Sequence, residues 1–162
     1  YPITVAFGVS QRVAWSSFSL SGPEGEPVEF VVSRTDWMRA AAGLAPLQWN
    51  NELAIAASDY AFYMASHSYF AHNTPEGTTP VSRSSAAGYP SFPWGTYVGE
   101  NLAKGFDSPD TVMQGWMNSE GHRRNVLLPD YIEIGVAVAA APDGTLYWAQ
   151  EFGNRPAIYA EE

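Results

Sequence analysis

The chain has 162 residues and 46% of them are hydrophobic, so it is long and apolar enough to form one folded domain with its own core. It carries 17 acidic and 8 basic side chains, and the net charge of −9 would repel phosphate backbones and anionic lipid surfaces, so we expect no nucleic-acid partner. The absence of cysteine excludes disulfides and thiolate metal sites. No apolar run approaches the roughly 18 residues of an integral membrane segment.

The first part of the chain has a β-strand pattern. Residues 1–32 contain short apolar runs separated by turn residues at 21–25, which predicts two or three strands, the last at residues 28–32. So short a segment can scarcely build a core of its own. We therefore interpret residues 1–32 as an N-terminal β arm packed on the main domain, with a fragment of a small β module as the alternative.

Helix signals follow. Ser33 or Thr35 can cap a short helix that Gly43 ends. Asn50 or Asn51 caps a second helix, in which apolar residues recur at helical spacing: Leu53, Ala56, Ala57, Tyr60 and Met64. A serine, a proline and an aspartate at 108–110 mark the start of a third helix.

The remaining segments are a long loop and a hairpin. Residues 66–98 have no sustained period, and their aromatic side chains favour an ordered, packed loop. Residues 132–138 and 146–152 alternate at period two around a turn at 142–144, which predicts a β-hairpin. Residues 154–162 are predicted to be a C-terminal tail. These patterns alone define the fold class as α+β.

Five polar residues stand where a site could form. Ser119, Glu120 and His122 cluster at a predicted helix end, and His72 and Glu100 each lie between small or aromatic neighbours, so two histidines and a carboxylate could converge. Each histidine also has a simpler interpretation. His72 could hydrogen-bond its own loop, and His122 could be a cation at a helix C-terminus.

The order of these residues resembles the CAP superfamily of cysteine-rich secretory, antigen-5 and pathogenesis-related proteins. Five motifs carry the resemblance: Phe70-Ala71-His72, Gly99-Glu100-Asn101, Trp116-x-x-Ser119-x-Gly121-His122-x-x-Asn125, Ile134-Gly135-Val136 and Tyr147-Trp148-x-Gln150-x-Phe152-Gly153. The chain is more similar to the cysteine-free bacterial branch. The resemblance covers residues 33–153 and implies a three-layer α-β-α sandwich with a central antiparallel sheet, flanked by the arm (1–32) and the tail (154–162).

The resemblance also implies a site. In the family, the histidines that correspond to His72 and His122 face each other across a central cleft with glutamates. Glu100 matches one cleft glutamate, and its place between a glycine and an asparagine suggests that it orients a histidine through a charge-assisted hydrogen bond. The position that holds a second glutamate in eukaryotic members is occupied by Ser119 in this chain. Glu120 is adjacent but would point elsewhere.

Family members are extracellular and are described mainly as binding or signalling modules, including lipid and sterol binders. The resemblance therefore implies an extracellular or cell-envelope protein, and we expect a monomeric, non-enzymatic binding module with no required cofactor. Its ligand would be small and apolar or amphipathic, or a divalent metal. Zinc would be held weakly by His72 and His122, with Glu100 as a third ligand or as the acceptor that fixes an imidazole tautomer.

Two alternatives stay open. One is a metal-assisted hydrolase, a peptidase or a glycosidase, that uses the same cleft; the chain has no Gly-x-Ser-x-Gly, His-Glu-x-x-His or phosphate-loop motif. Ser119, His122 and Glu100 could form a triad, or Glu100 could pair with Glu120 or Glu76 for glycoside hydrolysis. The other alternative is a structural or adhesive extracellular domain.

Overall fold

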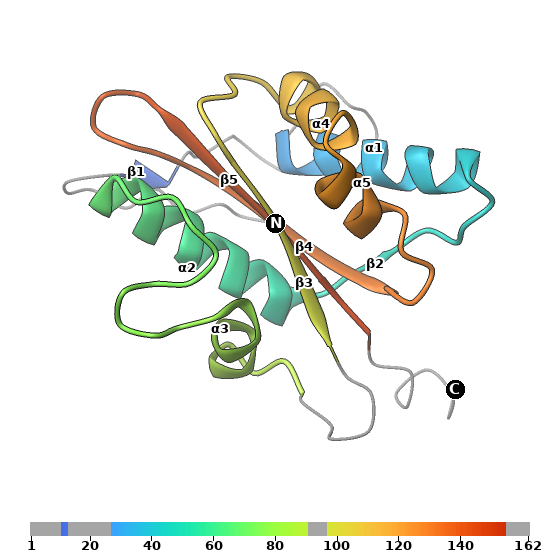
Figure 1. Ribbon diagram of the computed structural model, residues 1–162, viewed down its shortest axis with the longest axis horizontal. Coiled ribbons are helices and arrows are strands. Elements are labelled where there is room, and N and C mark those ends of the chain that lie inside the picture. The colour runs from blue at the N-terminus through green and yellow to red at the C-terminus, as the bar shows by residue number, and fades with distance from the viewer. Residues whose placement is uncertain (1–10, 13–26, 91–96, 155–162) are drawn as a thin grey trace.

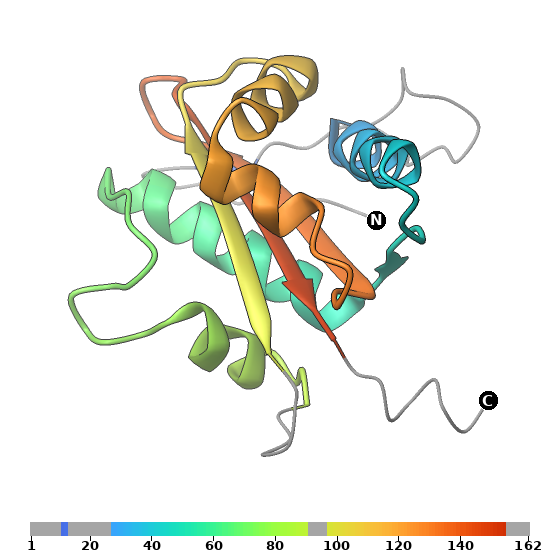
Figure 2. The same cartoon turned by 45° about the vertical axis from the view of Figure 1, so that its right-hand side comes forward.

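The computed structural model describes residues 11–12, 27–90 and 97–154. A central sheet lies between two helical layers (Figures 1 and 2). One layer contains α2 (Asn51–His67) and α3 (Pro80–Ala86), and the other contains α1 (Pro27–Ala41), α4 (Pro109–Met117) and α5 (Glu120–Val126). The predicted three-layer α-β-α sandwich is therefore confirmed. No helix within the described ranges is both long and apolar enough to cross a membrane.

The sheet is built on the predicted hairpin. Strands β4 (Glu133–Ala140) and β5 (Leu146–Gly153) pair antiparallel, and β3 (Val98–Lys104) pairs antiparallel with the other edge of β5. Two short strands flank β4: β1 (Gln11–Arg12) is antiparallel and β2 (Gln48–Trp49) is parallel to it. The order β1-β4-β5-β3 leaves β3 at an edge, and the site forms around that edge strand.

Successive side chains of a strand point to opposite faces, which divides the core into two clusters. Even-numbered residues of β4 and β5 pack with α1, α4 and α5, and Trp116 and Trp148 are fully buried there. Odd-numbered residues pack against α2 around Tyr60. On β3 the same alternation turns Glu100 toward the layer of α2 and α3, and Asn101 toward the layer of α4 and α5.

Three predicted helix boundaries are confirmed, one of them the start of α4, where Ser108 is the N-cap and Pro109 the first helical residue. Asn50 caps α2, because its side chain accepts a hydrogen bond from the Leu53 N–H. Gly43 follows α1 with a φ of +78°, a left-handed conformation that glycine adopts without a Cβ penalty.

The strand predicted at residues 28–32 is wrong, because these residues belong to α1. The buried residues Val28, Val31, Thr35 and Arg39 follow one another at helical spacing and line the face that α1 turns to the core. Thr35 is therefore inside the helix and is not its cap. Apart from β1, the strands expected in residues 1–26 lie outside the described residues, as does most of the predicted tail.

Two further helices were not predicted. The segment 66–98, expected to be a loop, contains α3, which Thr79 caps in a reciprocal pair of hydrogen bonds with Ser82. After α4 ends at Met117, the chain starts α5 with Ser119 as its N-cap residue. His122 therefore lies inside a short helix and not beyond a helix end, which argues against the simpler interpretation of His122 as a cation at the C-terminus of α4.

Candidate functional site

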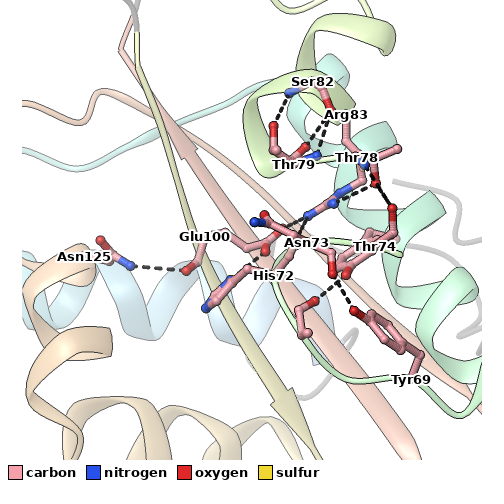
Figure 3. A network of polar contacts seen from close by, with 12 residues as sticks. Tyr69, His72, Asn73, Thr74, Thr78, Thr79, Ser82, Arg83, Glu100 and Asn125 are labelled. Carbon is pink, nitrogen blue, oxygen red and sulfur yellow. Dashed lines mark hydrogen bonds and ion pairs between the residues drawn. The ribbon is translucent and has the colours of Figure 1, made fainter. Parts of the chain in front are cut away.

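Glu100 is the centre of a buried polar network at the edge strand β3 (Figure 3). Its Oε1 lies 2.8 Å from Nδ1 of His72, and its Oε2 accepts a hydrogen bond of 2.9 Å from Arg83. The Glu100 side chain is only 1% exposed and that of Arg83 11%, whereas the His72 side chain is 55% exposed, so the carboxylate is buried and the imidazole reaches solvent. Its carboxylate thus orients the His72 ring, as its position in the sequence suggested.

Arg83, on α3, holds this network together. Its guanidinium also donates to the backbone oxygen of His72 at 2.8 Å and to Oγ1 of Thr78 at 3.2 Å, as drawn in Figure 3. It lies over the ring of Tyr60, 3.4 Å from the ring centroid, in a cation–π contact. Sequence reasoning missed Arg83, since nothing in a seven-residue helix indicates which strand it faces.

The second histidine is held from the other side of β3. Nδ1 of His122 lies 2.9 Å from Oγ of Ser119, one helical turn earlier on α5. The Asn101 amide donates to the backbone oxygen of His122 at 3.1 Å and so fixes α5 to the sheet. Asn125 donates to Asn101 at 2.8 Å. It also donates to the backbone oxygen of Glu100 at 3.3 Å, as Figure 3 shows.

The two histidines are electrostatically coupled across this edge. The hydrogen bond with Glu100 raises the pKa of His72 above its ordinary value. Burial, followed by the charge of His72, lowers the pKa of His122. At near-neutral pH, His72 is therefore the imidazole that keeps a proton more readily, while His122 is neutral.

A second carboxyl group lies against Glu100, and the sequence interpretation did not include it. Glu151 on β5 lies directly opposite Glu100 in the register of the two strands and is 1% exposed. Neither of its carboxyl oxygens receives a hydrogen bond from the described residues, so an ionised Glu151 would be unsatisfied. Burial and the charge of Glu100 raise the pKa of Glu151 well above its ordinary value, and the protonated group can donate a hydrogen bond to Glu100.

The residues considered for a catalytic triad or a carboxylate pair have other partners in this structure. Ser119 meets His122, but the carboxylate of Glu100 contacts His72 and Arg83, so the orienting member of the triad is engaged elsewhere. Glu120 is exposed and pairs with Arg124 at 3.2 Å. Glu76 is exposed too and accepts a hydrogen bond of 3.0 Å from Tyr63. The carboxyl group next to Glu100 is thus that of Glu151, on the neighbouring strand.

Comparison with known proteins agrees with this architecture. Residues 32–152 match the family described as CAP, the cysteine-rich secretory protein family. The chain is 37% identical over 122 residues to the uncharacterized protein YkwD of Bacillus subtilis (strain 168). That similarity covers 75% of this chain but 45% of the relative, so the chain spans less than half of that protein's length.

Two solved structures share the fold. An outer surface protein from Borrelia burgdorferi superposes with a TM-score of 0.72 at 25% identity, covering 83% of this chain and 96% of that one. An extracellular protein containing a SCP domain, from Bacillus anthracis str. Ames, gives a TM-score of 0.70 at 27% identity, covering 80% of this chain and 40% of that one. The protein is a CAP-domain protein: it belongs to the cysteine-rich secretory protein family.

Proposed function

We propose that this chain is an extracellular or cell-envelope binding module without enzymatic activity, and that its cleft takes up a divalent transition metal, zinc in the first place, between His72 and His122. The observation that carries this proposal is the orientation of the two rings. Each imidazole is held through Nδ1, His72 by Glu100 and His122 by Ser119, so each has Nε2 left for a ligand. The extracellular and outer-surface relatives support the location.

The donor set fits zinc in part. A neutral imidazole whose Nδ1–H is held by a carboxylate is a common zinc ligand, and Glu100 supplies that support to His72. The described residues contain no group of three or more histidine, cysteine, aspartate or glutamate side chains suited to a metal ion. Two protein ligands leave the other positions to water or to a partner molecule, so binding should be weak and folding should not require the metal.

The buried carboxylate favours binding over hydrolysis. A metal-assisted hydrolase needs a base that reaches the attacking water. Both oxygens of Glu100 are occupied by His72 and Arg83, and the side chain is 1% exposed. Glu151 is buried behind it. The centre thus offers two imidazole edges to solvent but no free carboxylate, which suits holding a ligand more than activating water.

Calorimetric titration with zinc tests the proposal. The wild type should bind weakly, and His72→Ala and His122→Ala should each lose that binding while both variants remain folded. His67→Ala is the matched control, since His67 is exposed on the last turn of α2 and stacks on Tyr63 at 4.1 Å. Equal zinc uptake by all four proteins would reject the cleft as the metal site.

A further inference from the structure

A chain of buried polar side chains crosses the core on the face of the sheet that α1, α4 and α5 cover. Asn101 on β3 lies directly opposite Gln150 on β5, and its amide nitrogen donates to Oε1 of Gln150 at 3.1 Å. Nε2 of Gln150 in turn donates to Oγ1 of Thr35, on α1, at 2.8 Å. All three residues are 0% exposed, so water cannot replace any of these partners. The chain thus connects α1 to the edge strand of the sheet.

Each hydrogen bond of this polar chain has a fixed direction. The backbone oxygen of Val31 can only accept, so the Thr35 hydroxyl donates to it, at 2.7 Å, and the hydroxyl oxygen is left to accept from Gln150. Because Gln150 turns its NH2 group to Thr35, it turns its carbonyl oxygen to Asn101. Asn101 must then present its own NH2 group. The Thr35 hydroxyl therefore decides the orientation of both amide groups.

The polar chain ends on α5. The NH2 group of Asn101 also donates to the backbone oxygen of His122 at 3.1 Å, and the Asn101 oxygen accepts from Asn125 at 2.8 Å. A reversed Asn101 amide would place oxygen against the His122 oxygen and NH2 against the NH2 of Asn125, and both bonds to α5 would be lost. Glu100, the preceding residue of β3, orients His72 from the other face of the sheet. Two adjacent residues of β3 thus each hold one histidine.

We propose that Thr35 and Gln150 are positioning residues for His122. They act through Asn101 and fix where α5 places the His122 imidazole, although neither side chain hydrogen-bonds to the ring. The loss of the Thr35 hydroxyl, on a helix that contributes no ligand, should therefore move a proposed zinc ligand on α5. The effect on zinc rests on the proposed function, whereas the placement of α5 can be measured without metal.

Thr35→Val tests the assignment, because valine is similar in size but cannot orient the Gln150 amide. In the metal-free full chain we expect the backbone amide resonances of α5 and the ring resonances of His122 to shift. Zinc affinity should fall about tenfold, as when a residue that orients a metal ligand is removed. Thr35→Ser keeps the hydroxyl and should restore both properties. Gln150→Met removes the amide at similar side-chain length and should reproduce the shifts of Thr35→Val.

Val28→Ala is the matched control for lost stability. Val28 is 1% exposed and lies on the same buried face of α1, but it takes no part in the polar chain. Its replacement should lower the melting temperature without moving the α5 and His122 resonances. Shifts in Val28→Ala as large as those in Thr35→Val, or unchanged resonances in folded Thr35→Val or Gln150→Met, would overturn the assignment. If the resonances move as expected but the wild type binds no zinc, the positioning role stands and the metal proposal alone fails.

Discussion

Glu100 and Glu151 lie directly opposite each other on β3 and β5, and both are buried, with 6% and 1% of their surfaces exposed. Like charges at directly opposed positions of a sheet destabilise it. Arg83 and His72 contact Glu100, while Glu151 has no donor of its own among the described residues. The pair is therefore stable with one proton, which Glu151 holds.

Replacing Glu151 by glutamine should make the protein more stable at high pH. Burial and the charge of Glu100 raise the pKa of Glu151 above 4.5, so the stability that its protonated form contributes is fully present below that value and is lost as pH rises through the raised pKa. A glutamine amide donates to Glu100 at every pH. At pH 8 we expect Glu151→Gln to be about 1–3 kcal/mol more stable than the wild type, the cost of leaving a buried group unsatisfied.

Thermal melting of both proteins between pH 4 and pH 9 checks this prediction. The curves should approach each other at the acid end and diverge as pH rises. Glu120→Gln serves as the control, because the Glu120 side chain is 79% exposed and its replacement should leave the pH dependence unchanged. Curves for Glu151→Gln and wild type that run parallel over the whole range would contradict the shared proton.

Arg83→Met should destabilise the protein far more than Arg124→Met, although each substitution removes an arginine from an ion pair with glutamate. The Arg83 side chain is 11% exposed and its partner Glu100 is 1% exposed, so the change leaves a buried carboxylate uncompensated. Arg124 and Glu120 are 69% and 79% exposed. We expect a loss of about 3–5 kcal/mol for the buried pair and less than about 1 kcal/mol for the surface pair.

Urea denaturation of the two variants measures these differences in the free energy of unfolding. The double variant Arg83→Met/Glu100→Gln should recover part of the loss, because the uncompensated charge is then gone. Similar losses for Arg83→Met and Arg124→Met would show that the buried network contributes no more than a surface pair does.

The two histidines should titrate on opposite sides of 6.5. The hydrogen bond with Glu100 raises the pKa of His72, and burial with the charge of His72 lowers that of His122. Glu100→Gln should therefore lower the pKa of His72 markedly, while Ser119→Ala should leave it in place. Imidazole NMR shifts followed from pH 4 to pH 9 report each ring separately, and an unchanged His72 titration in Glu100→Gln would refute the pairing.

Zinc binding should follow the same titration. A protonated imidazole cannot bind zinc. Because His72 has the raised pKa, zinc uptake should already decline above pH 6.5 as the pH is lowered, earlier than the reference value of histidine implies. Calorimetry at pH 6.5, 7.0 and 8.0 measures the trend. Affinity that does not change over this range would place any bound metal away from His72.

The fold could be predicted where one period governs a whole element. The hairpin alternates without interruption, and α2 carries both a cap and a long apolar face. Prediction failed at residues 28–32, where valine and phenylalanine dominate and local β propensity is high. The helical spacing becomes visible only when the pattern is followed to Thr35 and Arg39, because packing against α4 decides the conformation there.

The site was predictable only in part. His72, Glu100 and His122 stand in sequence motifs, but Arg83 and Glu151 join the network through packing between segments far apart in the chain. For Glu151 a signal existed. It alternates with Tyr147 and Ala149 in a strand whose other face is also apolar, and a carboxyl group buried in such a strand needs a partner.

Gly135 is where β4 approaches the backbone of α2, so Gly135→Ala should be strongly destabilising. A Cβ added at Gly135 would lie 2.2 Å from the Ala54 nitrogen and 2.4 Å from the Leu53 carbonyl carbon, which are backbone atoms that can move only if the whole helix shifts. Gly121 is the matched control, since a Cβ there meets nothing within 4 Å and alanine favours the helix α5. We expect Gly135→Ala to cost about 3 kcal/mol or more and Gly121→Ala to add about 0.5–1 kcal/mol of stability. Thermal and urea unfolding measure both.

Since His72 follows α2 closely in the chain, Gly135→Ala should also disturb the His72 ring resonances. A variant as stable as the wild type with unchanged His72 shifts would show that α2 is free to move away from the sheet.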